Sequence, residues 1–136
     1  MSTLPSRKRF LVAIPLGLTF GILCAWLASR QDPTIFNLKS FTFWTIVSNR
    51  LLIGAIVGLA GAYKVHPFLG FRIIPIVRGA ILGTLVSLTL AFGALIAAPE
   101  NATQIFWLIV GTGAIYGMII DLVATKIGGE GKALLT

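Results

Sequence analysis

The chain has 136 residues, of which 57% are hydrophobic and only 11% are charged. A soluble domain of this size usually carries about a quarter charged residues, so the composition excludes an ordinary water-soluble fold. The formal net charge is +7, but no basic face stands beside base-reading or stacking residues, which argues against nucleic acid as a partner.

Four apolar segments take up most of the sequence, at residues 10–29, 41–63, 73–98 and 104–127. A hydrocarbon core about 30 Å thick needs about 20 helical residues to cross it, and each segment reaches that length. We therefore predict one all-α membrane domain over residues 1–136, with four transmembrane helices in a glycine-rich bundle surrounded by the lipid bilayer.

The first segment follows Arg7, Lys8 and Arg9 and could be taken for a signal peptide. It is too long for an ordinary signal sequence, and Trp26 stands where cleavage requires a small residue. We expect a retained first helix.

The short connections carry very different charge on the two sides of the predicted membrane. One side has the basic residues Arg7, Lys8, Arg9, Lys64, Arg72, Lys126 and Lys132. The other side has only Arg30 and Lys39, with Asp32 and Glu100. This positive-inside asymmetry predicts that both termini are cytoplasmic. Trp26, Trp44 and Trp107 fall at the other interface, in agreement with the preference of indole rings for membrane surfaces.

The two halves of the chain share a weak repeat. Phe-Trp-x-Ile-Val at residues 43–47 recurs at residues 106–110, and two glycines of the first segment align with two of the third. Both hairpins begin on the same side, so the repeat predicts a pseudo-twofold axis along the membrane normal. Chance similarity between glycine-rich helices is the alternative.

Every predicted span contains small residues four positions apart. The glycines of these rows are Gly17, Gly21, Gly54, Gly58, Gly79, Gly83, Gly113 and Gly117. In lipid, helices associate largely through close backbone approach at such residues, so the rows predict tight helix packing. A crevice lined by glycine is the alternative interpretation.

Three ionisable residues lie inside the predicted spans, and each is a candidate for function because a charge in the membrane is costly. Arg78 and Asp121 have comparable depths and form the predicted ion pair. Arg50 lies about 14 Å into the second span, near the midplane, at 1.5 Å per residue.

The neighbours predicted for Arg50 carry no negative charge. Asn49, Thr112 and Tyr116 have similar depths and can accept hydrogen bonds. A midplane arginine without an acidic partner suggests an anion site or a wet crevice. The alternative is a structural arginine that bonds free carbonyls and hydroxyls.

No pattern for catalysis, a cofactor or a metal accompanies these residues. His66 stands alone without a second ligand at metal spacing, and Cys24 is the single cysteine. Phosphate-binding loops and paired carboxylates do not occur. We expect a protein that is not an enzyme and needs no cofactor.

One resemblance rests on two stretches of the sequence. They are Asn-Arg-Leu-Leu-Ile-Gly at residues 49–54 and Gly-Ala-Ile-Tyr-Gly-Met-Ile-Ile-Asp at residues 113–121. The chain resembles a loose group of small prokaryotic four-span membrane proteins, in which Tyr-Gly precedes an acidic residue in the last helix. The resemblance implies a prokaryotic inner membrane and no particular activity. We expect foremost a small accessory or scaffold subunit that packs through its glycine faces, in a homo-oligomer or larger membrane complex. The alternative is an anion or small-solute transport unit that uses Arg50.

Overall fold

The structure is a computed structural model that describes residues 7–65, 72–97 and 99–130. Its elements are α1 (Arg7–Ala28), α2 (Phe41–Leu59), η1 (Ala60–Ala62), α3 (Pro75–Ala97), η2 (Pro99–Asn101) and α4 (Ala102–Gly128). All four α-helices are long and apolar enough to cross a membrane. The prediction of an all-helical protein with four candidate spans is confirmed.

The helix bounds differ slightly from the predicted ones. The first helix begins at Arg7, three residues before the predicted start, and therefore includes Arg9. The second ends at Leu59 and continues as one 3₁₀ turn, and the fourth begins at Ala102. His66, Lys132 and the predicted end of the third span at Ala98 lie outside the described residues.

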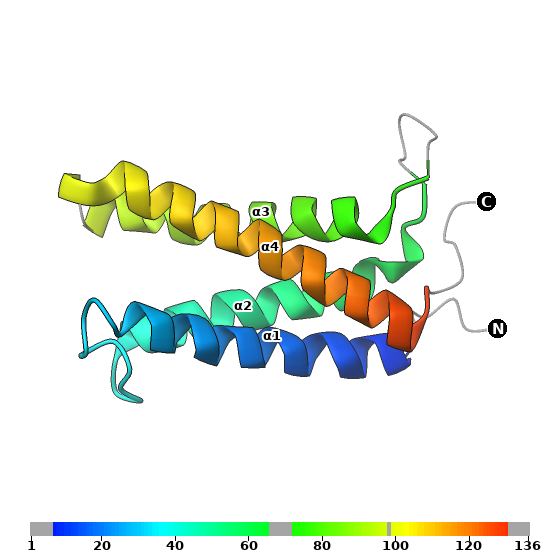
Figure 1. Cartoon of the computed structure of the whole chain (residues 1–136), viewed down its shortest axis with the longest axis horizontal. Coiled ribbons are helices and arrows are strands. Elements are labelled where there is room, and N and C mark those ends of the chain that lie inside the picture. The colour runs from blue at the N-terminus through cyan, green and yellow to red at the C-terminus, as the bar shows by residue number, and fades with distance from the viewer. Residues whose placement is uncertain (1–6, 66–71, 98, 131–136) are drawn as a thin grey trace.

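The helices form two antiparallel hairpins that lie against each other (Figure 1). Within each hairpin the packing is most extensive, between α1 and α2 and between α3 and α4. Helix α4 crosses toward α1 at the end of the bundle where α1 begins and α4 ends. We call this end, with Arg7, Leu59, Pro75 and Gly128, the terminal end. The distal end contains Ala28, Phe41 and Ala102.

Glycines bring the helices of each hairpin into contact. A methyl group added at Gly17 would lie 2.7 Å from the carbonyl oxygen of Arg50 and 3.1 Å from Gly54 Cα. In the second hairpin, Gly79 contacts the backbone of Gly117, and Gly83 contacts that of Gly113. Gly21 and Gly58 lie against Val47 and Phe10 in the same manner. The predicted glycine rows therefore lie at the interfaces inside the two hairpins.

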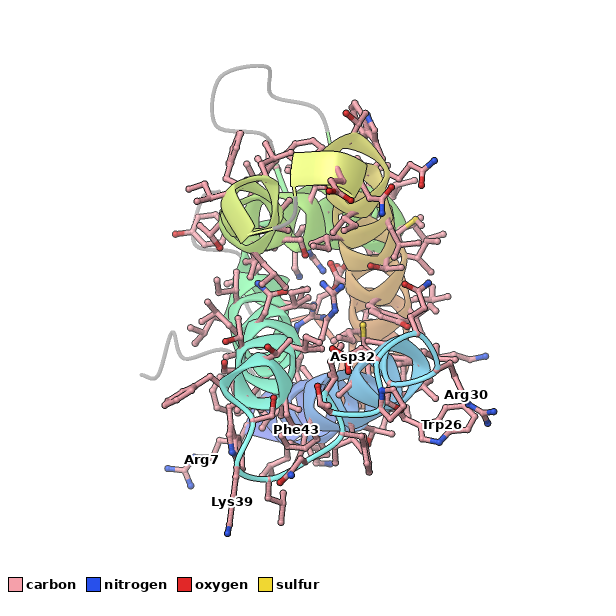
Figure 2. All side chains as sticks on the ribbon, turned by 90° about the vertical axis from the view of Figure 1, so that its left-hand side faces the viewer. Arg7, Trp26, Arg30, Asp32, Lys39 and Phe43 are labelled. Atoms are coloured by element: carbon pink, nitrogen blue, oxygen red, sulfur yellow. The ribbon has the colours of Figure 1, made fainter. Side chains whose placement is uncertain are left out.

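The basic residues divide into an exposed set and a buried set. Arg7, Arg30 and Lys39 point away from the helices, as Figure 2 shows along the bundle from its distal end. Three other arginines are buried: Arg9, Arg50 and Arg78. Asp121 and Ser87 are buried as well. Since a buried charge is expensive without partners, the surroundings of these arginines determine what they can do.

The α1–α2 connection is organised by its own polar side chains. The Thr34 hydroxyl and backbone N–H donate to Asp32 at 2.7 and 3.0 Å. These bonds lower the pKa of the Asp32 carboxyl below its ordinary value, the hydroxyl contributing most. The Arg30 guanidinium lies 4.4 Å above the Trp26 ring.

Candidate functional site

One cluster of buried charges is centred on Asp121 of α4. Arg78 of α3 donates to both carboxylate oxygens, from Nε to Oδ2 at 2.8 Å and from Nη2 to Oδ1 at 2.9 Å. The same arginine donates from Nη1 to the carbonyl oxygen of Tyr63 at 2.9 Å. The structure thus places the two predicted ion-pair residues in bidentate contact, the geometry in which arginine holds a carboxylate most firmly.

A second arginine, which the sequence reasoning missed, completes this cluster. Arg9 of α1 also pairs with Asp121 Oδ1, and its side chain is fully buried. Arg9 was expected among the loop charges because the first predicted span begins at residue 10. A signal was present: Arg9 stands four residues before Ala13 and eight before Gly17, on the buried face of α1.

The described hydrogen bonds use all the guanidinium nitrogens of Arg9. Nε and Nη2 donate to the Val57 carbonyl oxygen at 3.3 and 3.1 Å, and Nη1 donates to Thr125 Oγ1 at 2.6 Å. The cluster thereby joins all four helices at the terminal half of the bundle. It holds two guanidinium groups and one carboxylate. We call this cluster the clamp, because each of its charged groups already has a partner of opposite charge within it.

The second cluster surrounds Arg50 of α2 and contains only neutral partners among the described residues. Arg50 Nη1 donates to Asn49 Oδ1 at 3.1 Å and to Ser87 Oγ at 2.8 Å. Its Nη2 donates to Thr112 Oγ1 at 2.8 Å and lies 3.9 Å from Cys24 Sγ. Each of the four helices contributes to this cluster, yet none of these groups balances the positive charge.

One donor of Arg50 is left without an acceptor. Its Nε is buried and has no hydrogen-bond partner in the part of the chain that the structure describes. The guanidinium lies 5.3 Å from the ring of Tyr116, which in turn stacks on Phe20 with centroids 4.7 Å apart. An aromatic face attracts a cation but does not neutralise it. A buried polar atom without a partner requires an explanation, and a site that binds an ion is one.

A surface hollow of about 370 Å³ reaches the edge of this cluster from the side of the bundle. It lies between α2 and α3 and is lined by Thr45, Ser48, Asn49, Leu52, Thr89, Leu90 and Gly93. Arg50 itself is only 1% exposed. Asn49 belongs to both places, since it lines the hollow and accepts a bond from Arg50. The hollow therefore stops at Asn49, one side chain short of the guanidinium.

The structure brings together all four residues of the predicted polar site: Arg50, Asn49, Thr112 and Tyr116. The sequence reasoning missed Ser87 and set Cys24 aside. Ser87 could have been found, because it continues the four-residue row of Gly79 and Gly83. Among the described residues, no group of three His, Cys, Asp or Glu side chains could hold a metal ion.

No family model matches the chain, and comparisons with curated proteins and with solved structures found no match. The resemblance to small prokaryotic four-span proteins stays a prediction. Any functional argument must therefore start from the two arginine clusters themselves.

Proposed function

We propose that the protein is a membrane protein without catalytic activity that binds a small anion at Arg50 and conducts such anions across the bilayer. One observation carries this proposal: a buried arginine that has only neutral partners and one unused N–H. Ionisable residues inside transmembrane bundles are rare because they are costly, and they mark ion or substrate pathways in many membrane proteins.

An anion at Arg50 removes the electrostatic penalty of this site. A buried charge that lacks a counter-charge is destabilising, whereas a paired one is compensated by attraction in the low-dielectric interior. Chloride or a carboxylate would supply the missing charge and accept the Nε–H. The clamp around Asp121 offers no such opening, because every guanidinium nitrogen of Arg9 and Arg78 already donates to a partner.

The glycine contacts favour this function over the accessory role that the sequence put first. That role expects glycine faces to pack within the chain and also against a partner, and Gly17, Gly79 and Gly83 are already used by glycines of their own hairpin. The accessory role, like the homo-oligomer or larger complex, stays a prediction.

We propose that the protein lies in a prokaryotic inner membrane and that the terminal end of the bundle faces the cytoplasm. Support comes from the positive charge of the connections at that end. The tryptophans at the distal end, Trp26, Trp44 and Trp107, are 41%, 52% and 65% exposed, as expected of side chains at a lipid interface. A duplicated hairpin is part of the proposal, and two matched contacts support it: Gly17 with Gly54, and Gly79 with Gly117.

Anion flux through liposomes tests the proposal. Purified protein is reconstituted into vesicles that contain a chloride-sensitive fluorophore, and chloride entry is followed after a concentration step. We expect flux in the wild type and none above empty vesicles in Arg50→Gln, which keeps hydrogen-bonding capacity without the charge. Arg30→Gln is the matched control, since it removes the same charge from the exposed loop next to Trp26.

Size-exclusion chromatography and a thermal melt show whether each variant is folded. Wild-type vesicles that are no more permeable than empty ones would reject the conduction proposal. Equal flux in the wild type and in folded Arg50→Gln would reject Arg50 as the site.

A further inference from the structure

We propose that Cys24 is a site of oxidative modification, and that its sulfinate form supplies the negative charge that Arg50 lacks and thereby closes the anion site. Cys24 lies on α1, with its Sγ 3.9 Å from Arg50 Nη2. The guanidinium beside it is 1% exposed and has one buried N–H without a partner among the described residues. The effect on anion flux rests on the proposed function, whereas the oxidation and its effect on stability do not.

The edge of the Arg50 guanidinium that carries Nε and Nη2 faces Cys24. The N–H bonds of these two nitrogens point the same way in an arginine, because the guanidinium is a planar fork. Arg78 shows this with its Nε and Nη2 on the two oxygens of Asp121. In Arg50, Nη2 donates to Thr112 Oγ1 and lies beside Cys24 Sγ. The unused Nε–H therefore points toward the same side of the cluster as the thiol.

A sulfinate has the right shape and charge for this edge. Like a carboxylate, it carries two oxygens on one atom and is ionised at neutral pH. The distance of 3.9 Å between Nη2 and Sγ is about 1 Å longer than an ordinary N–H···O bond. An oxygen bound to the sulfur can therefore accept from Nη2, and the second oxygen can accept from Nε. Cys24 would then hold Arg50 as Asp121 holds Arg78, in a charge-assisted bidentate pair.

The surroundings of Cys24 are those of a reactive cysteine. Its side chain is partly exposed. It lies four residues before the end of α1 at Ala28, which is about 6 Å from the distal end of the helix. Reactive cysteines occupy partly exposed, electropositive places, whereas cysteines buried among apolar groups are inert. A partly exposed thiol beside an unneutralised guanidinium meets both conditions.

The oxidant in this proposal is hydrogen peroxide, and two molecules are consumed. In each step a sulfur–oxygen bond forms, the O–O bond of one peroxide breaks, the sulfur loses two electrons and one water is released. The first step converts the thiol to a sulfenic acid, and the second converts the sulfenic acid to a sulfinic acid, which gives its proton to water. Thiols do not reduce a sulfinate, so the closed state persists once it has formed.

Cys24→Asp tests the electrostatic part, because aspartate places a carboxylate where the sulfinate would be. Cys24→Asn is the matched neutral control. With Arg50 present, we expect Cys24→Asp to melt about 2–8 °C above Cys24→Asn in detergent micelles. Combined with Arg50→Gln, the order should reverse, because the carboxylate then has no counter-charge. An unchanged order in the two backgrounds would overturn the pairing of position 24 with Arg50.

Peroxide treatment of the wild-type protein tests the modification itself. We expect mass spectrometry to find two added oxygen atoms on Cys24, and the treated protein to melt at a higher temperature than the untreated one. Cys24→Ser cannot form a sulfinate, so peroxide should leave its melting temperature unchanged. In liposomes, chloride flux through the wild type should be lost after treatment, while Cys24→Ser keeps whatever flux it had before.

Each readout can contradict the inference separately. If Cys24 remains a thiol in the folded protein while the unfolded chain is oxidised, Cys24 is not a modification site. If the oxidised protein melts no higher than the untreated one, the sulfinate does not neutralise Arg50. If chloride flux survives complete oxidation, the site is not closed by it. If oxidation raises the melting temperature but the untreated wild type conducts no chloride, the counter-charge inference stands and the proposed function fails.

Discussion

The two arginine clusters of this bundle contain the same kind of side chain in opposite situations. At the terminal half, Arg9 and Arg78 share the carboxylate of Asp121. Near the middle of α2, Arg50 is surrounded by an amide, hydroxyls, a thiol and an aromatic ring. The difference teaches that burial alone does not make an arginine structural. A buried arginine has a structural role when the protein itself supplies its counter-charge.

Glycines pack closely against both clusters, and the difference in packing lies beside the second one. Next to Asp121, Gly79 and Gly117 bring α3 and α4 into backbone contact. Gly17 likewise packs against the backbone of Arg50, but beside Asn49 the two hairpins leave a hollow whose wall includes Gly93. Closely packed helices whose buried charges share an internal counter-charge resist rearrangement, whereas the open region beside Asn49 has fewer contacts to lose.

The largest effect is expected for Asp121→Asn. The variant keeps the shape of the side chain but leaves two buried guanidinium groups without a counter-charge, and breaking a buried pair in this way destabilises a protein by about 3–5 kcal/mol. Unfolding in mixed detergent micelles measures the change. A loss below about 1 kcal/mol, the value of a surface pair, would contradict the description of this cluster as a clamp.

Alanine at Gly79 should destabilise the bundle more than alanine at Gly93. An added methyl at Gly79 lies 2.7 Å from Asp121 Cβ and meets the Gly117 backbone, while the same group at Gly93 meets nothing within 4 Å in the described chain. Overpacking costs about 1–3 kcal/mol. Gly93→Ala should be neutral or slightly stabilising, since alanine is the better helix former. Equal melting temperatures for the two variants would refute the contrast in packing.

A double-mutant cycle should show that Arg78 and Asp121 act together. We expect Arg78→Gln combined with Asp121→Asn to cost less than the sum of the single changes, with a coupling of about 0.5–3 kcal/mol. Arg78→Gln alone should cost less than Asp121→Asn, because Arg9 still pairs with the carboxylate. Additive melting data would exclude the coupling.

The smallest effect on stability is expected for Arg50→Met. Replacing a buried charge by an apolar side chain of similar length is often neutral or stabilising, so we expect a change within about 1 kcal/mol in the same micelles. Chloride flux should nevertheless disappear. A loss as large as that of Asp121→Asn would show that Arg50 holds the bundle together as Arg9 and Arg78 do.

Much of the fold and part of the site follow from the sequence. The length of an apolar segment can be compared directly with the thickness of a bilayer. Most ends of the four helices therefore lie within a few residues of the predicted ones. Arg50 with its polar neighbours, and Arg78 with Asp121, follow from depth alone, because residues at equal depth on neighbouring helices can meet. Arg9 was missed because its depth was judged from a helix that began three residues too late.

The sequence by itself determined how many helices could cross a membrane, their order, and three of the ionisable side chains that they bury, Arg50, Arg78 and Asp121. The reason is that apolar length and four-residue spacing are local properties of the chain. Only the tertiary structure decided that α4 crosses α1 so that Arg9 reaches Asp121, and that the hairpins leave a hollow beside Asn49. Helix rotation and crossing depend on how side chains from distant segments fit together, and no single segment carries that information.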